Sequence, residues 1–290
     1  MLSRFARCIV SFLLPAFLIG VPLPVECQTT DYAVVRANKE IGVSFSPSYI
    51  AYDEYSNGAV LDSEHGWIPG VGVKATGVFN VLKMTNVLLG AAYDFNNGTS
   101  NHCCLLLNVN SGISLTYAAP FRSNDLLIWL GKGFLPNRKL LLTAEGQSEY
   151  RAWLRRLPAA TFDTREDYTF WAPGVAIGAS YNPVTSLVVK GKAGFEYTVS
   201  PANAGGGNPN AEIPVPSSTM VLGSHPLWQL GGGADWAITR AIHAYTDANY
   251  SRFGFGRSVD YYYDNDKEFH YEPSSVTHLI RVNVGLAWSF

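Results

Sequence analysis

Charged residues are scarce in this chain. Asp, Glu, Lys and Arg make up 15% of its 290 residues, whereas soluble domains usually contain roughly a quarter. The formal net charge is −2, which leaves no electrostatic basis for binding nucleic acid. Hydrophobic residues reach 47% and aromatic residues 13%. This composition excludes a nucleic-acid-binding role and favours surroundings less polar than water.

Long apolar runs are also missing beyond the N-terminus. After residue 27, no stretch has the roughly 18 consecutive apolar residues that a membrane helix requires. A closed β-barrel is the other structure that satisfies every backbone polar group inside a bilayer. If this chain spans a membrane, it is therefore expected to span it with strands.

The N-terminus has the features of a secretory signal. Arg4 and Arg7 supply positive charge before an apolar stretch at 9–25 that three prolines interrupt, which is typical of a cleaved segment. We predict cleavage after Cys27, with a lipidated Cys27 as the alternative. The predicted organisation is a signal peptide at 1–27, a short periplasmic segment at 28–39 and an outer-membrane β-barrel at 40–290.

The stretch 278–290 alternates strictly between apolar and polar or small residues. Side chains along a strand point to opposite faces in turn, so this segment has one apolar face. That face contains Ile280, Val282, Val284, Leu286, Trp288 and Phe290, and the other contains Arg281, Asn283, Gly285, Ala287 and Ser289. An apolar outer face with a polar inner face is typical of a barrel strand that contacts lipid.

The same alternation recurs along the chain and predicts an all-β fold, a transmembrane antiparallel up-and-down β-barrel. Ten strands are expected at about 40–53, 66–79, 86–97, 125–135, 139–154, 168–181, 186–199, 226–238, 242–255 and 278–290. The expected extracellular loops are 54–65, 98–124, 155–167, 200–225 and 256–277. The stretch 103–117 could be a further strand or a hairpin above the membrane, so twelve strands, or eight, are alternatives.

With this closing strand and these repeated alternations, residues 40–290 resemble the porin-like and OmpA-like outer-membrane β-barrel proteins of Gram-negative bacteria. The resemblance implies an outer-membrane location in contact with lipid and lipopolysaccharide. It also implies that the barrel-assembly machinery inserts the chain and reads Trp288 and Phe290 as its C-terminal signal. The oligomeric state stays open.

The inner faces of the predicted strands form a mixed polar network. Its members are Glu40, Lys74, Asp94, Glu145, Glu149, Arg151, Lys190, Lys192, Glu196, Asp235, His243, Asp247 and Arg281. Charges inside a narrow barrel must be paired or hydrated, because leaving them bare costs several kcal/mol. We therefore predict a salt-bridged interior with either a structural role or a narrow path for small solutes.

Catalytic and metal-binding patterns are not apparent in the sequence. Outer-membrane proteases need paired carboxylates and an Asp–His pair near the outer rim, and no Asp-x-His stands in a rim position. His243 and Asp247 are expected near the periplasmic end. His102 adjoins Cys103 and Cys104, but zinc would need further ligands. The sequence thus predicts no enzyme, no metal and no cofactor.

Two long loops offer an alternative function. Residues 200–225 are rich in Gly, Pro and Asn, and residues 256–277 are rich in Tyr and acidic residues. Tyrosine supplies rigid amphipathic contact area, as it does in binding loops. A surface-binding or adhesin-like protein is therefore the second hypothesis, and an enzyme at the rim is the third.

Overall fold

The computed structural model describes residues 32–104, 115–158, 163–207, 218–262 and 269–290. The predicted signal peptide at 1–27 lies outside the described residues. Within the described ranges, no helix has both the length and the apolar character needed to cross a membrane.

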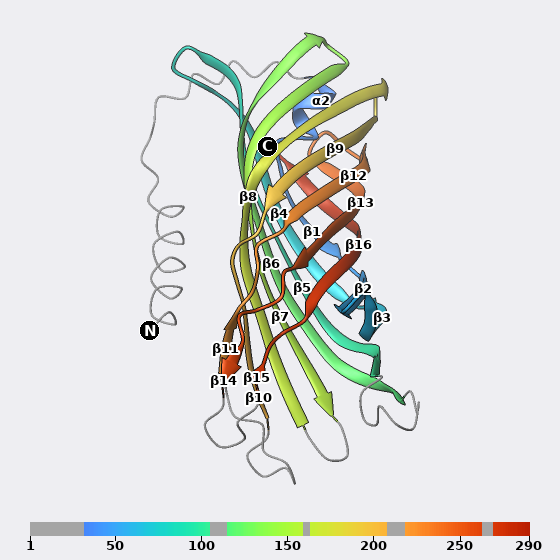
Figure 1. Cartoon of the computed structure of the whole chain (residues 1–290). Coiled ribbons are helices and arrows are strands. Elements are labelled where there is room, and N and C mark those ends of the chain that lie inside the picture. The colour runs from blue at the N-terminus through green and yellow to red at the C-terminus, as the bar shows by residue number, and fades with distance from the viewer. Residues whose placement is uncertain (1–31, 105–114, 159–162, 208–217, 263–268) are drawn as a thin grey trace, which may run out of the picture.

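The described chain forms one antiparallel sheet that closes on itself (Figure 1). β1 pairs with β4 on one side and with β16 on the other, which joins the first strand to the last. The strands are β1 Glu40–Phe45, β2 Ser48–Ser56, β3 Ala59–Ile68, β4 Gly70–Val81, β5 Met84–Cys104, β6 Leu115–Asn137, β7 Leu140–Pro158, β8 Asp163–Val184, β9 Leu187–Tyr197, β10 Val199–Gly207, β11 Ser218–Val221, β12 Pro226–Ala237, β13 Ile242–Phe255 and β16 Ser274–Ser289, with a separate two-stranded ribbon of β14 Tyr261–Tyr262 and β15 Phe269–His270.

Ten strands make up the ring. The sheet contains 14 strand segments, and four pairs of these are single strands with a short break (β1/β2, β3/β4, β9/β10 and β11/β12), so 14 − 4 = 10. Pro47 and Pro69 lie in the first two breaks, where the missing N–H of proline interrupts the ladder. The predicted fold and strand number are confirmed.

The outer surface of the ring is apolar, as the alternation predicted. On β16, the exposed fraction is 57% for Val284 and 55% for Trp288, whereas Arg281 and Ala287, which face the lumen from the same strand, are buried. In water this surface would be unfavourable, but it suits contact with lipid.

Several strands continue well past the thickness of a membrane. β5, β6, β7 and β8 contain 21, 23, 19 and 22 residues, whereas a tilted barrel strand crosses a bilayer with about 9–11. The prediction of loops at 98–124 and 155–167 was therefore wrong for most of their length. Residues 98–104 pair with 115–121, which is the hairpin alternative, and 105–114 lie outside the described residues.

The predicted loop at 54–65 is also largely strand. β2 and β3 form a hairpin whose turn residues Asn57 and Gly58 have φ values of 51° and 81°, the left-handed conformation that two-residue hairpin turns require. Polar side chains on both faces hide the alternation outside the bilayer, although backbone pairing continues there.

A one-turn helix, α2 (Ala33–Arg36), lies within the end of the ring where the C-terminus is found (Figure 1). The side chains of Val34 and Val35 are buried against Leu88 and Leu141 of the barrel wall. The segment predicted as a short periplasmic extension at 28–39 thus packs inside the barrel over its described part, residues 32–39.

Candidate functional site

The barrel interior is layered. At the end of the ring that holds α2 lies an apolar layer of Val34, Val35, Ala37, Val78, Leu88, Leu141 and Val188, which we call the inner apolar layer. α2 supplies Val34 and Val35, and Ala37 directly follows it, so the N-terminal segment closes this end of the lumen.

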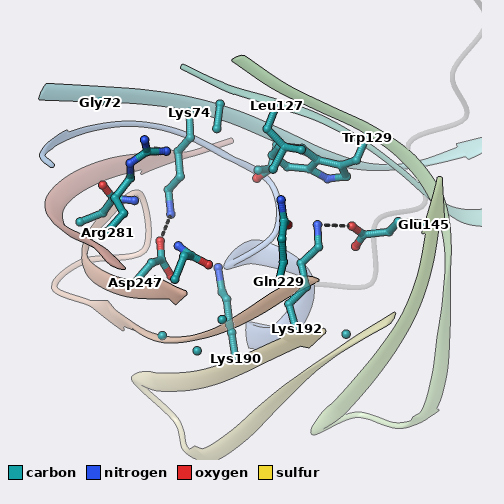
Figure 2. Close-up of a pocket in the computed structure, with 18 of the residues that line it drawn as sticks. Gly72, Lys74, Leu127, Trp129, Glu145, Lys190, Lys192, Gln229, Asp247 and Arg281 are labelled. Carbon is teal, nitrogen blue, oxygen red and sulfur yellow. Dashed lines mark hydrogen bonds and ion pairs between the residues drawn. The ribbon is translucent and has the colours of Figure 1, made fainter. Parts of the chain in front are cut away.

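Above the inner apolar layer lies a polar cavity of about 250 Å³. Its wall includes polar side chains from β1, β4, β7, β9, β12, β13 and β16. Figure 2 shows Lys74, Lys190 and Lys192 projecting into this space from opposite walls. We call it the chamber.

The structure places the sequence-predicted interior residues in or beside the chamber, and it pairs them. Within this set, the charged contacts are Lys74–Glu40 (2.9 Å), Lys74–Asp247 (3.4 Å), Lys190–Glu40 (3.7 Å), Lys192–Glu145 (2.7 Å), Arg151–Glu149 (2.8 Å), Arg281–Asp94 (3.1 Å) and His243–Asp235 (2.8 Å). Glu196 accepts a hydrogen bond from Gln147 at 2.7 Å.

Exposure to the chamber differs between the two signs of charge. The Lys192 and Lys190 side chains are 30% and 20% exposed, whereas their partners Glu145 and Glu40 are 7% and 0% exposed. Asp247, which pairs with Lys74, is the more exposed carboxylate, at 25%, and a solute in the chamber would contact it. The carboxylates thus lie mainly within the wall, while the ammonium groups line the wet surface.

An aromatic layer closes the chamber toward the outside. It contains Phe121, Trp153, Tyr168, Phe170, Phe253 and Phe255, with Ile50, Tyr52, Ile68, Leu222, Leu227 and Leu279 around them. Trp153 on β7 contacts Phe253 on β13 with ring centroids 5.2 Å apart, and Phe170 on β8 contacts Phe253 at 5.4 Å. β13 is not a neighbour of β7 or β8 in the sheet, so these contacts cross the lumen.

Beyond the aromatic layer, one arginine meets an excess of carboxylates. The Arg155 guanidinium lies 2.7 Å from Glu166 and 3.3 Å from both Glu54 and Glu64. Asp62 is 3.8 Å away, and Arg155 is 1% exposed. Together with Glu272, which accepts a hydrogen bond from Tyr168, these residues form what we call the outer carboxylate cluster.

The outer carboxylate cluster retains protons near neutral pH. Burial raises the pKa of Glu54 to about 7, with Glu166 and Asp62 adding repulsion while Arg155 opposes the shift. Burial raises the pKa of Glu272 to about 8, again with repulsion from neighbouring glutamates. Buried carboxylates with like-charged neighbours shift in this direction, and such shifts are typical of functional sites.

The cluster also contains an Asp–His pair. His102 Nε2 lies 2.8 Å from Asp62 Oδ2, and His102 is 0% exposed. The two residues are far apart in sequence and meet because β3 pairs with β5 at Glu64–His102. Reasoning from sequence missed this pair, since both residues fell in stretches assigned to loops.

One further interior residue, Asp125, was missed as well. Asp125 accepts a hydrogen bond from Arg281, and the alternation of its strand could have identified it. Gln229, which the alternation does place on the inner face, donates to Glu149 at 2.9 Å. The C-terminal aromatic residues Trp288 and Phe290 are exposed, with ring centroids 6.0 Å apart, and their role as an assembly signal stays a prediction.

Comparison with known proteins finds likeness in structure. No protein-family model matches the chain, and no curated protein sequence matches it. The crystal structure of the outer-membrane protease OmpT from Escherichia coli matches with a TM-score of 0.60 at 13% identity, covering 87% of this chain and 95% of that one. The toluene transporter TodX of Pseudomonas putida (TM-score 0.31, 10% identity, 87% and 89% covered) and Ail of Yersinia pestis (0.33, 11%, 87% and 98%) match at scores too low to carry an argument.

The chain therefore has the fold of an outer-membrane β-barrel protein, and the apolar outer surface of its ring suits contact with lipid. The prediction that it is not an enzyme is contradicted, because the same fold carries an enzyme in OmpT. At 13% identity this likeness establishes the fold alone. The Asp62–His102 pair also removes the sequence argument that no Asp–His pair lies near the outer rim.

Proposed function

We propose that this barrel is a narrow, normally closed path for small anionic solutes. The observation that carries the proposal is the charge on the wet surface of the chamber. Lys74, Lys190 and Lys192 project into it, while Glu40 and Glu145 lie within the wall. A small anion in the chamber meets the ammonium groups of Lys190 and Lys192, which are more exposed than their carboxylate partners.

Opening of the path requires both closures to move. The inner apolar layer depends on a single helical turn, and the aromatic layer depends on ring contacts across the lumen. A chamber of about 250 Å³ admits molecules of a few heavy atoms, far below the water-filled lumen of barrels with sixteen or more strands.

Planar-bilayer recording tests this proposal. The residues 28–290 are refolded in detergent, inserted and recorded in a KCl gradient, where the reversal potential reports the preference for chloride over potassium. We expect an anion preference that falls severalfold in Lys190→Gln/Lys192→Gln. The matched control is Lys132→Gln, which removes a lysine that is exposed near a periplasmic turn.

Two outcomes would overturn the proposal. One is the absence of conductance from protein that is demonstrably folded and inserted. The other is a reversal potential that the chamber substitutions leave at the value of the Lys132→Gln control.

A second candidate function is hydrolysis at the extracellular end. The Asp62–His102 pair at 2.8 Å favours it, because a carboxylate that orients an imidazole is the basis of general-base catalysis. The pair is buried in this structure, so a substrate reaches it only if the residues that cover it move.

A peptide library with mass-spectrometric readout tests hydrolysis. Cleavage by the wild-type barrel should be lost in Asp62→Asn and retained in Asp167→Asn, a change to an exposed ion pair on β8. Equal cleavage by wild type and Asp62→Asn would exclude this function for the pair.

A further inference from the structure

A second cluster of ionisable groups lies between the chamber and α2. It joins Glu40 at the start of β1, Asp235 on β12 and His243 on β13, and each is at most 2% exposed. Each offers one ligand atom, and these atoms all lie within 4.8 Å of one another. The function proposed above does not use this cluster as a unit.

We propose that Glu40, Asp235 and His243 form a binding site for a single zinc-like divalent cation. One imidazole nitrogen and two carboxylate oxygens are a ligand set that zinc takes in proteins, with the fourth position left to water. The three residues come from three strands of a closed ring, so the barrel fixes their positions.

The distances fit such an ion. Ligands at about 2.0–2.1 Å in a tetrahedral arrangement lie about 3.3 Å from each other. His243 Nδ1 is 2.8 Å from Asp235 Oδ1 and 3.8 Å from Glu40 Oε2. These two values bracket the required separation, and all three ligand atoms lie within 4.8 Å of one another.

Unmet bonding capacity at the cluster is an independent indication of a ligand. Within the described part of the chain, neither Asp235 Oδ2 nor His243 Nε2 has a hydrogen-bond partner, whereas Glu40 Oε1 faces the ammonium groups of Lys74 and Lys190. Burying such groups without partners costs about 1–3 kcal/mol each, and more if they are charged. A cation would satisfy the carboxylates directly.

Two lysines compete for the same carboxylate. Lys74 and Lys190 place their Nζ atoms 2.9 Å and 3.7 Å from Glu40 Oε1. Both have another partner: Lys74 also contacts Asp247 at 3.4 Å, and Lys190 donates to the Ala37 carbonyl. Binding of a cation can therefore displace the ammonium groups from Glu40 without leaving them unpaired.

The position of the site gives it a structural consequence. In the ring, β16 lies between β1 and the pair β13–β12. An ion held by all three residues would therefore connect β1 to β12 and β13 across the seam at which the ring closes. Residue 40 follows directly after the segment of α2, so the ion would also anchor that segment.

Zinc binding is measured on residues 28–290 refolded in detergent with ZnCl₂ and then dialysed against buffer without metal. Metal is quantified by mass spectrometry, and affinity by competition with a chelating dye. We expect one zinc per wild-type barrel. His243→Gln and Asp235→Asn should each bind at least tenfold more weakly.

The matched control is His278→Gln, which changes a half-buried histidine bonded to Tyr250. It should bind zinc as the wild type does. Each variant is checked for folding by heat-dependent electrophoretic mobility, so that loss of zinc is not mistaken for loss of the barrel. Zinc-free wild-type protein, or zinc retained in folded His243→Gln, would overturn the proposal.

Discussion

Arg155 is the residue whose surroundings say most about this barrel. One buried guanidinium faces Glu54, Glu64 and Glu166 within 3.3 Å, with Asp62 slightly farther away. One positive charge cannot neutralise so many carboxylates, and therefore some of them stay protonated in the folded state. At the outer end of the barrel, Glu54 and Glu272 therefore have pKa values close to neutral pH.

This excess of acid predicts a pH dependence with a definite sign. The pKa values of Glu54 and Glu272 are raised to about 7 and about 8, whereas the ordinary pKa of glutamate, which the unfolded chain has, is 4.5. The folded state therefore holds more protons between these values, and its stability falls as pH rises from 4.5 to 8. The loss is at most about 1.4 kcal/mol per pH unit for each group.

Hydrogen exchange at Ser258 and Glu272 measures this effect, because the Ser258 N–H donates to the Glu272 carbonyl and the Glu272 N–H donates to Ser258 Oγ. After correction for intrinsic rates, we expect weaker protection at pH 9 than at pH 6. Glu272→Gln should flatten the difference, and Asp167→Asn should preserve it. Equal protection at both pH values in wild type would contradict the raised pKa values.

At the scale of elements, α2 depends on its packing for its position. A single turn has no stability of its own, so burial of Val34 and Val35 keeps it in the lumen. Val35→Asp places a carboxylate in the inner apolar layer, where burying a charge is costly. We expect the segment before Glu40 to leave its seat while the ring survives.

Limited proteolysis added to the periplasmic face checks this displacement. The N-terminal segment of Val35→Asp should be cut at least tenfold faster than in Val35→Ala, which keeps the site apolar. Similar rates for the two variants would mean that the carbonyl and amide bonds of residues 36–39, rather than apolar burial, hold the segment.

The elements also show how far sequence reasoning reaches. Alternation is local, so it located the ten strands and their inward residues, including Lys74 and Arg281. It failed where both faces of a strand are polar, and that is where Glu54, Asp62 and Arg155 lie. The position of α2 could not be predicted from the sequence either. Its few apolar residues can be recognised as buried only when the width of the adjacent lumen is known.

The whole molecule is held by ring closure between β1 and β16. A closed ring leaves no open edge, and we expect folded protein to migrate faster than boiled protein in detergent gels. Gly285 lies on this seam, where a Cβ would stand 2.2 Å from the Val43 carbonyl oxygen. Gly285→Ala should reduce the heat-modifiable fraction, since overpacking costs roughly 1–3 kcal/mol.

Gly191→Ala is the control for that substitution. Gly191 is also a strand glycine, but a Cβ there meets nothing within 4 Å. It should migrate as the wild type does. If both variants keep the full heat-modifiable fraction, the seam tolerates distortion and closure does not limit stability.

The pairing of Glu40 with Ser289 has a consequence for the order of events during biogenesis. These partners are 289 − 40 = 249 positions apart. Closing so long a loop costs conformational entropy, and this cost is offset only when the hydrogen bonds between β1 and β16 have formed. Until β16 has formed, β1 can therefore pair only with β4. During that interval the lumen is a trough rather than a tube, and this is when α2 can enter it sideways without threading through an end.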